Sequence, residues 1–202
     1  MKFVEHSVND LLAAIRSPEP TPGGGSAAAL AGAMGASLLA MVAGLPKSKA
    51  STEEDVARLK AAGARCTELA QTLAGLIDRD SEAYGLVVAA YKRPKATDEE
   101  KAARSTAIQE GFRAAIAAPL DVMRACAAAA EQGVVILALG NPSAASDGQV
   151  GLELLGAGLR GARMNVEINL DSVKDAHYVA GVRNDVNEFE RALAHETAAA
   201  RR

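Results

Sequence analysis

The stretch Pro20-Thr21-Pro22-Gly23-Gly24-Gly25-Ser26 lies directly ahead of the least polar part of the chain. Two prolines and three consecutive glycines favour a turn, and serine is a preferred residue at a helix N-cap. Residues 27–45 then carry no charge and consist almost entirely of Ala, Gly, Leu, Met and Val. A helix that is apolar on every side is typical of a buried position. The sequence therefore predicts a turn, an N-cap at Ser26 and a long central helix buried all round.

The glycine turn is also a candidate binding element. Glycines ahead of a helix expose backbone N–H groups at the positive end of the helix dipole, which suits a carbonyl, carboxylate or phosphate. A tight turn without a ligand is the commoner reason for such glycines. The spacing matches neither a Walker A loop nor a dinucleotide fingerprint. We interpret Gly23, Gly24, Gly25 and Ser26 as the border of a different kind of small-molecule site.

The apolar run is long enough to cross a bilayer, so a membrane helix is the alternative to a core helix. The run is rich in Ala and Gly, and it has no Trp or Tyr at its ends to lie at a membrane interface. Ala28, Gly32, Ala36 and Ala40 recur every four residues and form a stripe that lets neighbouring helices approach closely. We therefore expect a core helix and no membrane association.

Composition limits the class of protein. The chain has 202 residues, which fits one domain spanning residues 1–202, and its abundant alanine and other helix formers predict an all-α fold. The net charge is -3, aromatic residues are 3% and Trp is absent, which disfavours nucleic-acid binding. The first residues lack the apolar region of a signal peptide, so we expect a cytoplasmic protein.

The remaining chain has the pattern of a helix bundle. Residues 51–54 and 97–100 both resemble capping boxes, and each precedes a long helical pattern. Pro119 is expected to kink or divide the second of these helices, and Gln132-Gly133 to mark a pause. Residues 134–139 are apolar enough for a strand, but a strand would have no partner here, so we predict helix. About seven helices in up-and-down order result.

The chemistry must come from carboxylates, amides and backbone N–H groups. His6, His177 and His195 are far apart, which supports neither a metal site nor a Ser-His-Asp triad. Asp80 is four residues from both Leu76 and Tyr84, in line with an apolar stripe. An inward carboxylate has a raised pKa and can act as a general acid or base. The alternative is an ion pair with Arg79 or with a neighbouring helix.

Two further polar groups occur where burial is expected. Asn141 precedes Ser146-Asp147 at the start of a predicted helix, and a helix N-cap is the simplest role for Ser146 or Asp147. A functional role would require Asp147 to face a pocket together with Asn141. Asn165 and Asn169 lie on one helical face, where Asn is a poor helix former. A neighbouring helix, a second subunit and a ligand all remain possible partners for them.

Several of these motifs together resemble one family. The glycine motif is followed by Asp80-x-Glu82-Ala83-Tyr84 and by Pro94-Lys95-x-Thr97-Asp98-Glu99-Glu100-Lys101. Downstream come Gly140-Asn141, Ser146-Asp147-Gly148, Gly158-Leu159-Arg160 and Asn165-Val166-x-Ile168-Asn169. This combination resembles the cyclodeaminase/cyclohydrolase family of folate enzymes over about residues 4–190. The resemblance implies an all-helical, usually dimeric protein that acts on the one-carbon unit of tetrahydrofolate without a metal or nicotinamide cofactor.

The resemblance also implies roles for individual residues. Asp80 and Asp147 would be catalytic, and the glycine turn would line the substrate pocket. Asn141 and Asn165 would contact the pterin or its one-carbon group, and Lys47 or Lys49 would bind the anionic glutamate tail. The expected reaction is hydrolysis of 5,10-methenyltetrahydrofolate to 10-formyltetrahydrofolate. The alternatives are formiminotetrahydrofolate cyclodeamination and folate binding without catalysis. The last has one support, the sequence Leu45-Pro46-Lys47-Ser48-Lys49-Ala50, which replaces the family's usual Gly-Lys-Lys-type turn.

Overall fold

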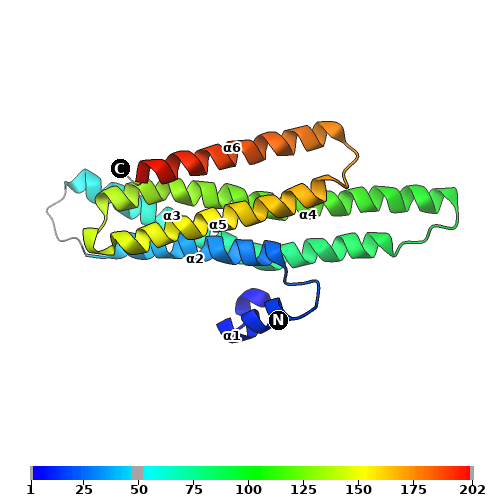
Figure 1. Ribbon diagram of the computed structural model, residues 1–202, viewed down its shortest axis with the longest axis horizontal. Coiled ribbons are helices and arrows are strands. Elements are labelled where there is room, and N and C mark those ends of the chain that lie inside the picture. Colours follow the sequence, from blue (N-terminus) through cyan, green and yellow to red (C-terminus); the bar gives the residue numbers. More distant parts are fainter. Residues whose placement is uncertain (1, 47–51, 201–202) are drawn as a thin grey trace.

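The computed structural model describes residues 2–46 and 52–200, and within them every regular element is helical (Figure 1). The α-helices are α1 (Val8–Arg16), α2 (Gly24–Gly44), α3 (Glu53–Tyr91), α4 (Asp98–Leu139), α5 (Ala145–Leu170) and α6 (Ala176–Ala200). Short 3-10 helices occur at Phe3–Glu5 (η1) and Pro142–Ala144 (η2). The all-α bundle is confirmed.

The described α-helices number six rather than the expected seven or so, because α4 is longer than predicted. It continues through Gly133 and through the buried Pro119, so the predicted pause at Gly133 is wrong, and of the two expectations for Pro119 the division of the helix is wrong. Its last residues, which we expected to be helical rather than a strand, are helical. The capping box of Thr97 and Glu100 is confirmed at its start, where Thr97 Oγ1 accepts from Glu100 N at 3.2 Å.

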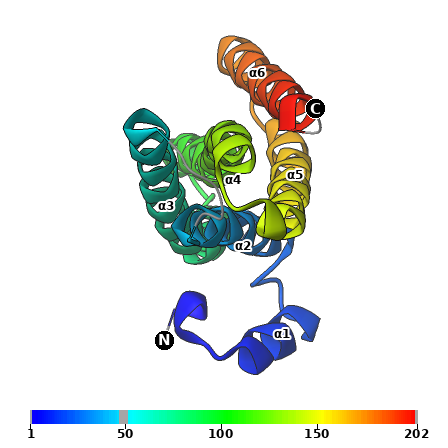
Figure 2. The ribbon, with the colours of Figure 1, turned by 90° about the vertical axis from the view of Figure 1, so that its left-hand side faces the viewer.

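Helix α2 packs between α3 and α5 on the side of the bundle that faces α1, and α4 lies in the middle of the bundle, in contact with α3, α5, α6 and α2 (Figure 2). The helix α6 packs mainly on α4, and α1 lies apart from the bundle (Figure 2). The N-terminal segment is attached to α3 through η1, where the amide groups of Phe3 and Val4 donate to the buried carboxylate of Asp78. The long helices α3 and α4 extend beyond the start of α2 (Figure 1), so the bundle continues past the N-terminal end of α2.

The start of α2 differs from the prediction in one respect. Gly23 is the N-cap and the helix begins at Gly24, so the prediction of Ser26 as the cap is wrong. No glycine has a positive φ, and Gly24 and Gly25 already belong to the first turn of the helix. The Ser26 hydroxyl is buried and donates to the carbonyl oxygen of Ile77 at 2.8 Å. Ser26 therefore attaches the start of α2 to α3.

The small residues of α2 allow its backbone to approach that of α5. A Cβ atom placed on Gly35 would lie 2.6 Å from the carbonyl oxygen of Gly151, and one on Gly158 would lie 2.8 Å from that of Ala28. Both distances are shorter than a methyl group tolerates. The two helices therefore need glycine at these positions to keep their spacing.

We expect Gly35→Ala to lower the free energy of unfolding by about 1–3 kcal/mol, because the added methyl meets a backbone atom that moves only with its helix. Chemical denaturation followed by circular dichroism measures the change. The matched control is Gly75→Ala on α3, where nothing lies within 4 Å of the new Cβ. That variant is expected to gain up to about 1 kcal/mol from helix propensity. Equal stability of the two variants would contradict the close-packing argument.

The prediction that α2 is buried on every side is wrong. Met34 is 50% exposed and Met41 is 43% exposed, so part of the helix surface faces outward. By length and composition alone, α2 and α4 could each cross a membrane, and 44% and 50% of their most apolar windows are buried within the bundle. Core helices of soluble bundles meet the same criteria, so this finding decides nothing about a membrane.

Candidate active site

A cavity of about 250 Å³ lies at the N-terminal end of α2, where α3, α4 and α5 continue beyond it. The glycine turn forms one wall, and each of the three helices forms another. The lining residues are Pro20, Thr21, Gly23, Gly24, Gly25, Asp80, Tyr84, Val87, Phe112, Ala115, Asn165 and Asn169. Of the residues predicted for a ligand site, the glycines, Asp80 and Asn165 are brought together here.

Asp80 is held against the first turn of α2. Its carboxylate accepts hydrogen bonds from Ser26, from the hydroxyl at 3.3 Å and from the backbone N–H. A Cβ atom on Gly25 would lie 2.1 Å from Asp80 Oδ1 and 2.5 Å from its Cγ, so only glycine leaves room for the carboxylate. The N-terminal N–H groups of a helix have no partner within the helix, and they carry partial positive charge. The glycine turn therefore serves to admit a carboxylate to the end of α2.

The surroundings of Asp80 raise the pKa of its carboxyl group. Burial is the main cause, and the hydrogen bonds from Ser26 partly oppose it. Among residues 2–46 and 52–200 no ion pair involves Asp80, so the alternative of an ion pair finds no support there, and Arg79 instead pairs with Asp121 on α4 at 2.7 Å. A carboxyl group with a raised pKa is a stronger base when ionised, and it holds a proton closer to neutral pH. The cavity thus contains one group suited to proton transfer.

The two asparagines supply hydrogen-bond acceptors opposite Asp80. Asn165 Nδ2 donates to Gly161 O at 3.0 Å and Asn169 Nδ2 donates to Asn165 O at 2.7 Å. Each bond uses one of the two N–H groups of an amide, and both side chains still line the cavity. The amide of Asn165 lies beside Gly24, whose Cβ position is 3.5 Å from Asn165 Nδ2. The sequence analysis left a ligand as one of three possible partners for Asn169 and did not consider Phe112, and the structure places both in the cavity lining.

Comparisons with known proteins show the family to which this chain belongs. A family model described as formiminotransferase-cyclodeaminase matches residues 7–188. The chain belongs to the formiminotransferase-cyclodeaminase family. A methenyltetrahydrofolate cyclohydrolase of Methylorubrum extorquens is 38% identical over 188 residues, covering 93% of this chain and 89% of the relative. The resemblance inferred from the motifs is confirmed.

Other members of the family extend this comparison. A formimidoyltransferase-cyclodeaminase of Sus scrofa is 34% identical over 175 residues, which are 87% of this chain and 32% of that longer protein. A crystal structure of formiminotetrahydrofolate cyclodeaminase from Thermotoga maritima superposes with a TM-score of 0.86 at 25% identity. The superposition covers 97% of this chain and 94% of the other. The bundle is therefore the fold of this family.

Asp147 and Asn141 do not reach the cavity, so the expectation that they share one cleft with Asp80 within a single chain is wrong. Asp147 is exposed in the first turn of α5, eighteen residues before Asn165. At about 1.5 Å per residue, this separation corresponds to roughly 27 Å along the helix. The amide of Asn141 caps η2, and its Nδ2 donates to Pro46 O at 2.8 Å. Lys47 and Lys49 lie outside the described residues.

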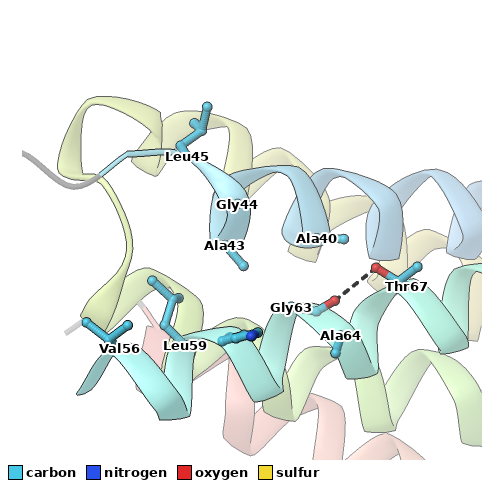
Figure 3. A pocket seen from close by; sticks show the side chains of 10 residues that line it. Ala40, Ala43, Gly44, Leu45, Val56, Leu59, Gly63, Ala64 and Thr67 are labelled. Carbon is cyan, nitrogen blue, oxygen red and sulfur yellow. Dashed lines mark hydrogen bonds between the residues drawn. The ribbon is translucent and has the colours of Figure 1, made fainter. Parts of the chain in front are cut away.

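A larger pocket of about 530 Å³ lies at the opposite end of α2, between that helix and the start of α3 (Figure 3). Small and apolar side chains line it, and its polar side chains are Lys60 and Thr67. The Thr67 hydroxyl donates to Gly63 O at 3.0 Å (Figure 3), so it is already used within the helix. This pocket holds no carboxylate or amide for proton transfer.

Nucleophilic and metal chemistry find little support in residues 2–46 and 52–200. Burial raises the pKa of both thiols, Cys66 and Cys126, to about 12, so they are protonated near neutral pH. No group of three or more His, Cys, Asp or Glu side chains within those residues could hold a metal ion. Asp80 remains the candidate for chemistry in this member of the family.

Proposed function

We propose that this chain is a folate one-carbon enzyme that hydrolyses 5,10-methenyltetrahydrofolate to 10-formyltetrahydrofolate. The observation that carries the proposal is the carboxyl group of Asp80, half-buried against the start of α2 in a cavity with two amide side chains. The similarity to the Methylorubrum extorquens cyclohydrolase over most of both chains supports this reaction.

The methenyl carbon lies between two nitrogens that share a positive charge, so an ionised carboxylate beside it stabilises the bound substrate. Ionised Asp80 can take a proton from water as the water oxygen bonds to that carbon. The resulting tetrahedral carbon carries a hydroxyl group. As its bond to N5 breaks, Asp80 returns the first proton to N5, and the hydroxyl releases its proton to solvent to become the formyl C=O. The carbon keeps its oxidation level, so the step consumes only water and needs no nicotinamide cofactor. Tyr84, Val87 and Phe112 provide apolar walls for the pterin.

Cyclodeamination is the second candidate, and the Thermotoga maritima structure favours it. In that reaction N10 bonds to the formimino carbon and ammonia leaves. The tetrahedral carbon again lies between nitrogens, and a carboxyl group again has to move protons. The same position of Asp80 therefore serves both reactions.

Purified protein distinguishes these candidates directly. Loss of the absorbance of methenyltetrahydrofolate, above its uncatalysed rate, reports the hydrolase. Release of ammonia from formiminotetrahydrofolate reports the deaminase. We expect turnover of the methenyl substrate at a rate at least tenfold above that of the formimino substrate. Binding of tetrahydrofolate without turnover of either would show a catalytically inactive folate-binding protein and overturn the proposal.

We also propose that the protein is a homodimer, acting in the cytoplasm and not attached to a membrane. The outer face of α2 supports the dimer, because Met34 and Met41 are exposed on a helix that has no charged residue. In the proposed dimer, a second copy packs on this face of α2 and covers Met34 and Met41. In such a dimer, Asp147 would reach a site only on the partner. Sedimentation of the wild type and of Met34→Glu tests the dimer, and an unchanged mass of the variant would contradict this interface.

A further inference from the structure

A second, strongly basic pocket of about 540 Å³ adjoins the candidate active site. It lies at the C-terminal end of α3 and the N-terminal end of α4, beside the turn between α5 and α6. The lining residues are Tyr91, Lys95, Lys101, Arg104, Ser105, Ile108, Gln109, Phe112, Ser172 and Lys174. Phe112 lines both this pocket and the cavity that contains Asp80. The two spaces therefore meet at one side chain.

The walls of the two spaces continue along the same helices. On α3, the cavity residues Tyr84 and Val87 are followed one turn later by Tyr91. On α4, Ile108 and Lys101 extend the helix face of Phe112 toward the basic pocket. The residues of one face of a helix follow one another at about one turn, so a ligand lying along α3 and α4 contacts both spaces.

The wall provided by α5 continues in the same direction. Asn165 and Asn169 line the cavity, and Ser172 and Lys174 line the basic pocket. Gln109 connects this wall to α4, because its amide donates to Ser172 O at 3.0 Å and accepts from Lys174 N at 2.8 Å. The turn carrying Lys174 is thus fixed against α4.

The charge of this pocket differs from that of the whole protein. Four cationic side chains and no acidic side chain line it, whereas the chain has a net charge of -3. Lys101 is paired with the highly exposed Asp98, and Arg104 donates to Tyr91 O at 3.2 Å. Within the part of the chain that the structure describes, no ion pair or hydrogen bond involves Nζ of Lys95 or Lys174. These two ammonium groups are available to an anionic ligand.

Aromatic rings mark the junction between the cavity and the basic pocket. Tyr91 and Phe112 are in edge-to-face contact, with their centroids 6.4 Å apart. An aromatic segment passing the junction would contact these rings, and a carboxylate beyond it would meet the four cations. A folate has this order: a pterin, an aminobenzoyl ring and one or more glutamates.

We propose that the basic pocket binds the glutamate tail of the folate substrate, through Lys95 and Lys174 in particular. This inference rests on the proposed function, and it assigns the tail to residues other than Lys47 and Lys49. Carboxylates bound by ammonium groups in a partly enclosed pocket form charge-assisted hydrogen bonds, which are stronger than neutral ones. Each added glutamate brings a further carboxylate, so affinity should rise with tail length.

The test compares the wild type with the double variant Lys95→Gln/Lys174→Gln on three methenyl substrates. These carry no glutamate, one glutamate or three γ-linked glutamates. We expect the double variant to raise KM for the triglutamate about tenfold with kcat unchanged, and to leave KM for the glutamate-free substrate unchanged. The control variant Arg58→Gln/Lys60→Gln removes the same charge near the other end of α3 and should change none of these values.

Equilibrium binding of tetrahydropteroate and of tetrahydrofolate triglutamate separates this inference from the proposed function. If the wild type binds the triglutamate more tightly and the double variant loses that preference, the tail site stands even if no turnover occurs. An equal change for both ligands would show a structural role and overturn the inference. No preference of the wild type for the triglutamate would overturn it as well.

Discussion

Asp80→Asn is expected to lower kcat for the methenyl substrate by about 10²–10⁴-fold, because it removes the group that transfers the proton. The amide has nearly the shape of the carboxylate, and its one oxygen can still accept a hydrogen bond from Ser26. Substrate binding should therefore change far less than kcat. Single-turnover measurement of absorbance loss gives the chemical step directly. A variant with more than a tenth of the wild-type rate would remove Asp80 from the mechanism.

The pH profile gives a second test of the same residue. The wild-type rate should fall as pH decreases through the pKa of Asp80, which burial raises above the ordinary aspartate value of 3.8. This acidic limb should be missing from the residual activity of Asp80→Asn. Measurement of kcat/KM across pH, with substrate stability checked at each point, distinguishes a proton-transfer role from a structural one.

Stability should move in the opposite direction from activity. A carboxyl group whose pKa is raised in the folded protein favours folding when protonated, and this advantage is lost as pH rises through the raised pKa. At neutral pH, Asp80→Asn should therefore unfold no more readily than the wild type. The neighbouring Asp78→Asn is the matched control, since Asp78 accepts from Phe3 N at 2.6 Å and from Val4 N. That variant should weaken attachment of the N-terminal segment, detected by faster proteolysis before α1.

The sequence predicted the features that depend on local pattern. The all-α class, the helix starting near Thr97 and the inward position of Asp80 followed from propensity, capping chemistry and helical periodicity. Ser26 was wrongly predicted as an N-cap because the helix begins two residues earlier, at Gly24. The hydrogen bond from Ser26 to Ile77 O could not be predicted either, because it depends on how α2 packs against α3. Exposure of Met34 and Met41 was also missed, since an apolar helix does not reveal which neighbour covers each face.

Relations between distant segments were harder to predict. The prediction that Asp147 lies beside Asp80 failed because the sequence does not show which end of α5 meets the glycine turn. In the structure it is the end that carries Asn165. The basic pocket was missed because its cations come from the α3–α4 turn, from α4 and from the turn before α6. The spacing of Lys101, Ile108 and Phe112 on one helix face was a usable signal, but Lys174 joins them only through the fold.

Gly25→Ala is expected to lower kcat/KM by about 100-fold or more while leaving the fold intact. The new methyl would lie 2.1 Å from Asp80 Oδ1, so the carboxylate has to leave its position against α2. The clash is with the end of a side chain rather than with backbone, and alanine favours a helix over glycine, so the free energy of unfolding should change by less than about 1 kcal/mol. Activity assays and denaturation of the same sample measure both effects.

Two further variants make this prediction specific to the contact with Asp80. Gly85→Ala on α3 adds a methyl with nothing within 4 Å and should keep wild-type activity. The double variant Gly25→Ala/Asp80→Asn should be no less active than Asp80→Asn alone, because the methyl then displaces a group that no longer transfers protons. Additive losses would show instead that Gly25 acts on the substrate independently of Asp80. The requirement for glycine at residue 25 would in that case come from direct contact between the turn and the folate.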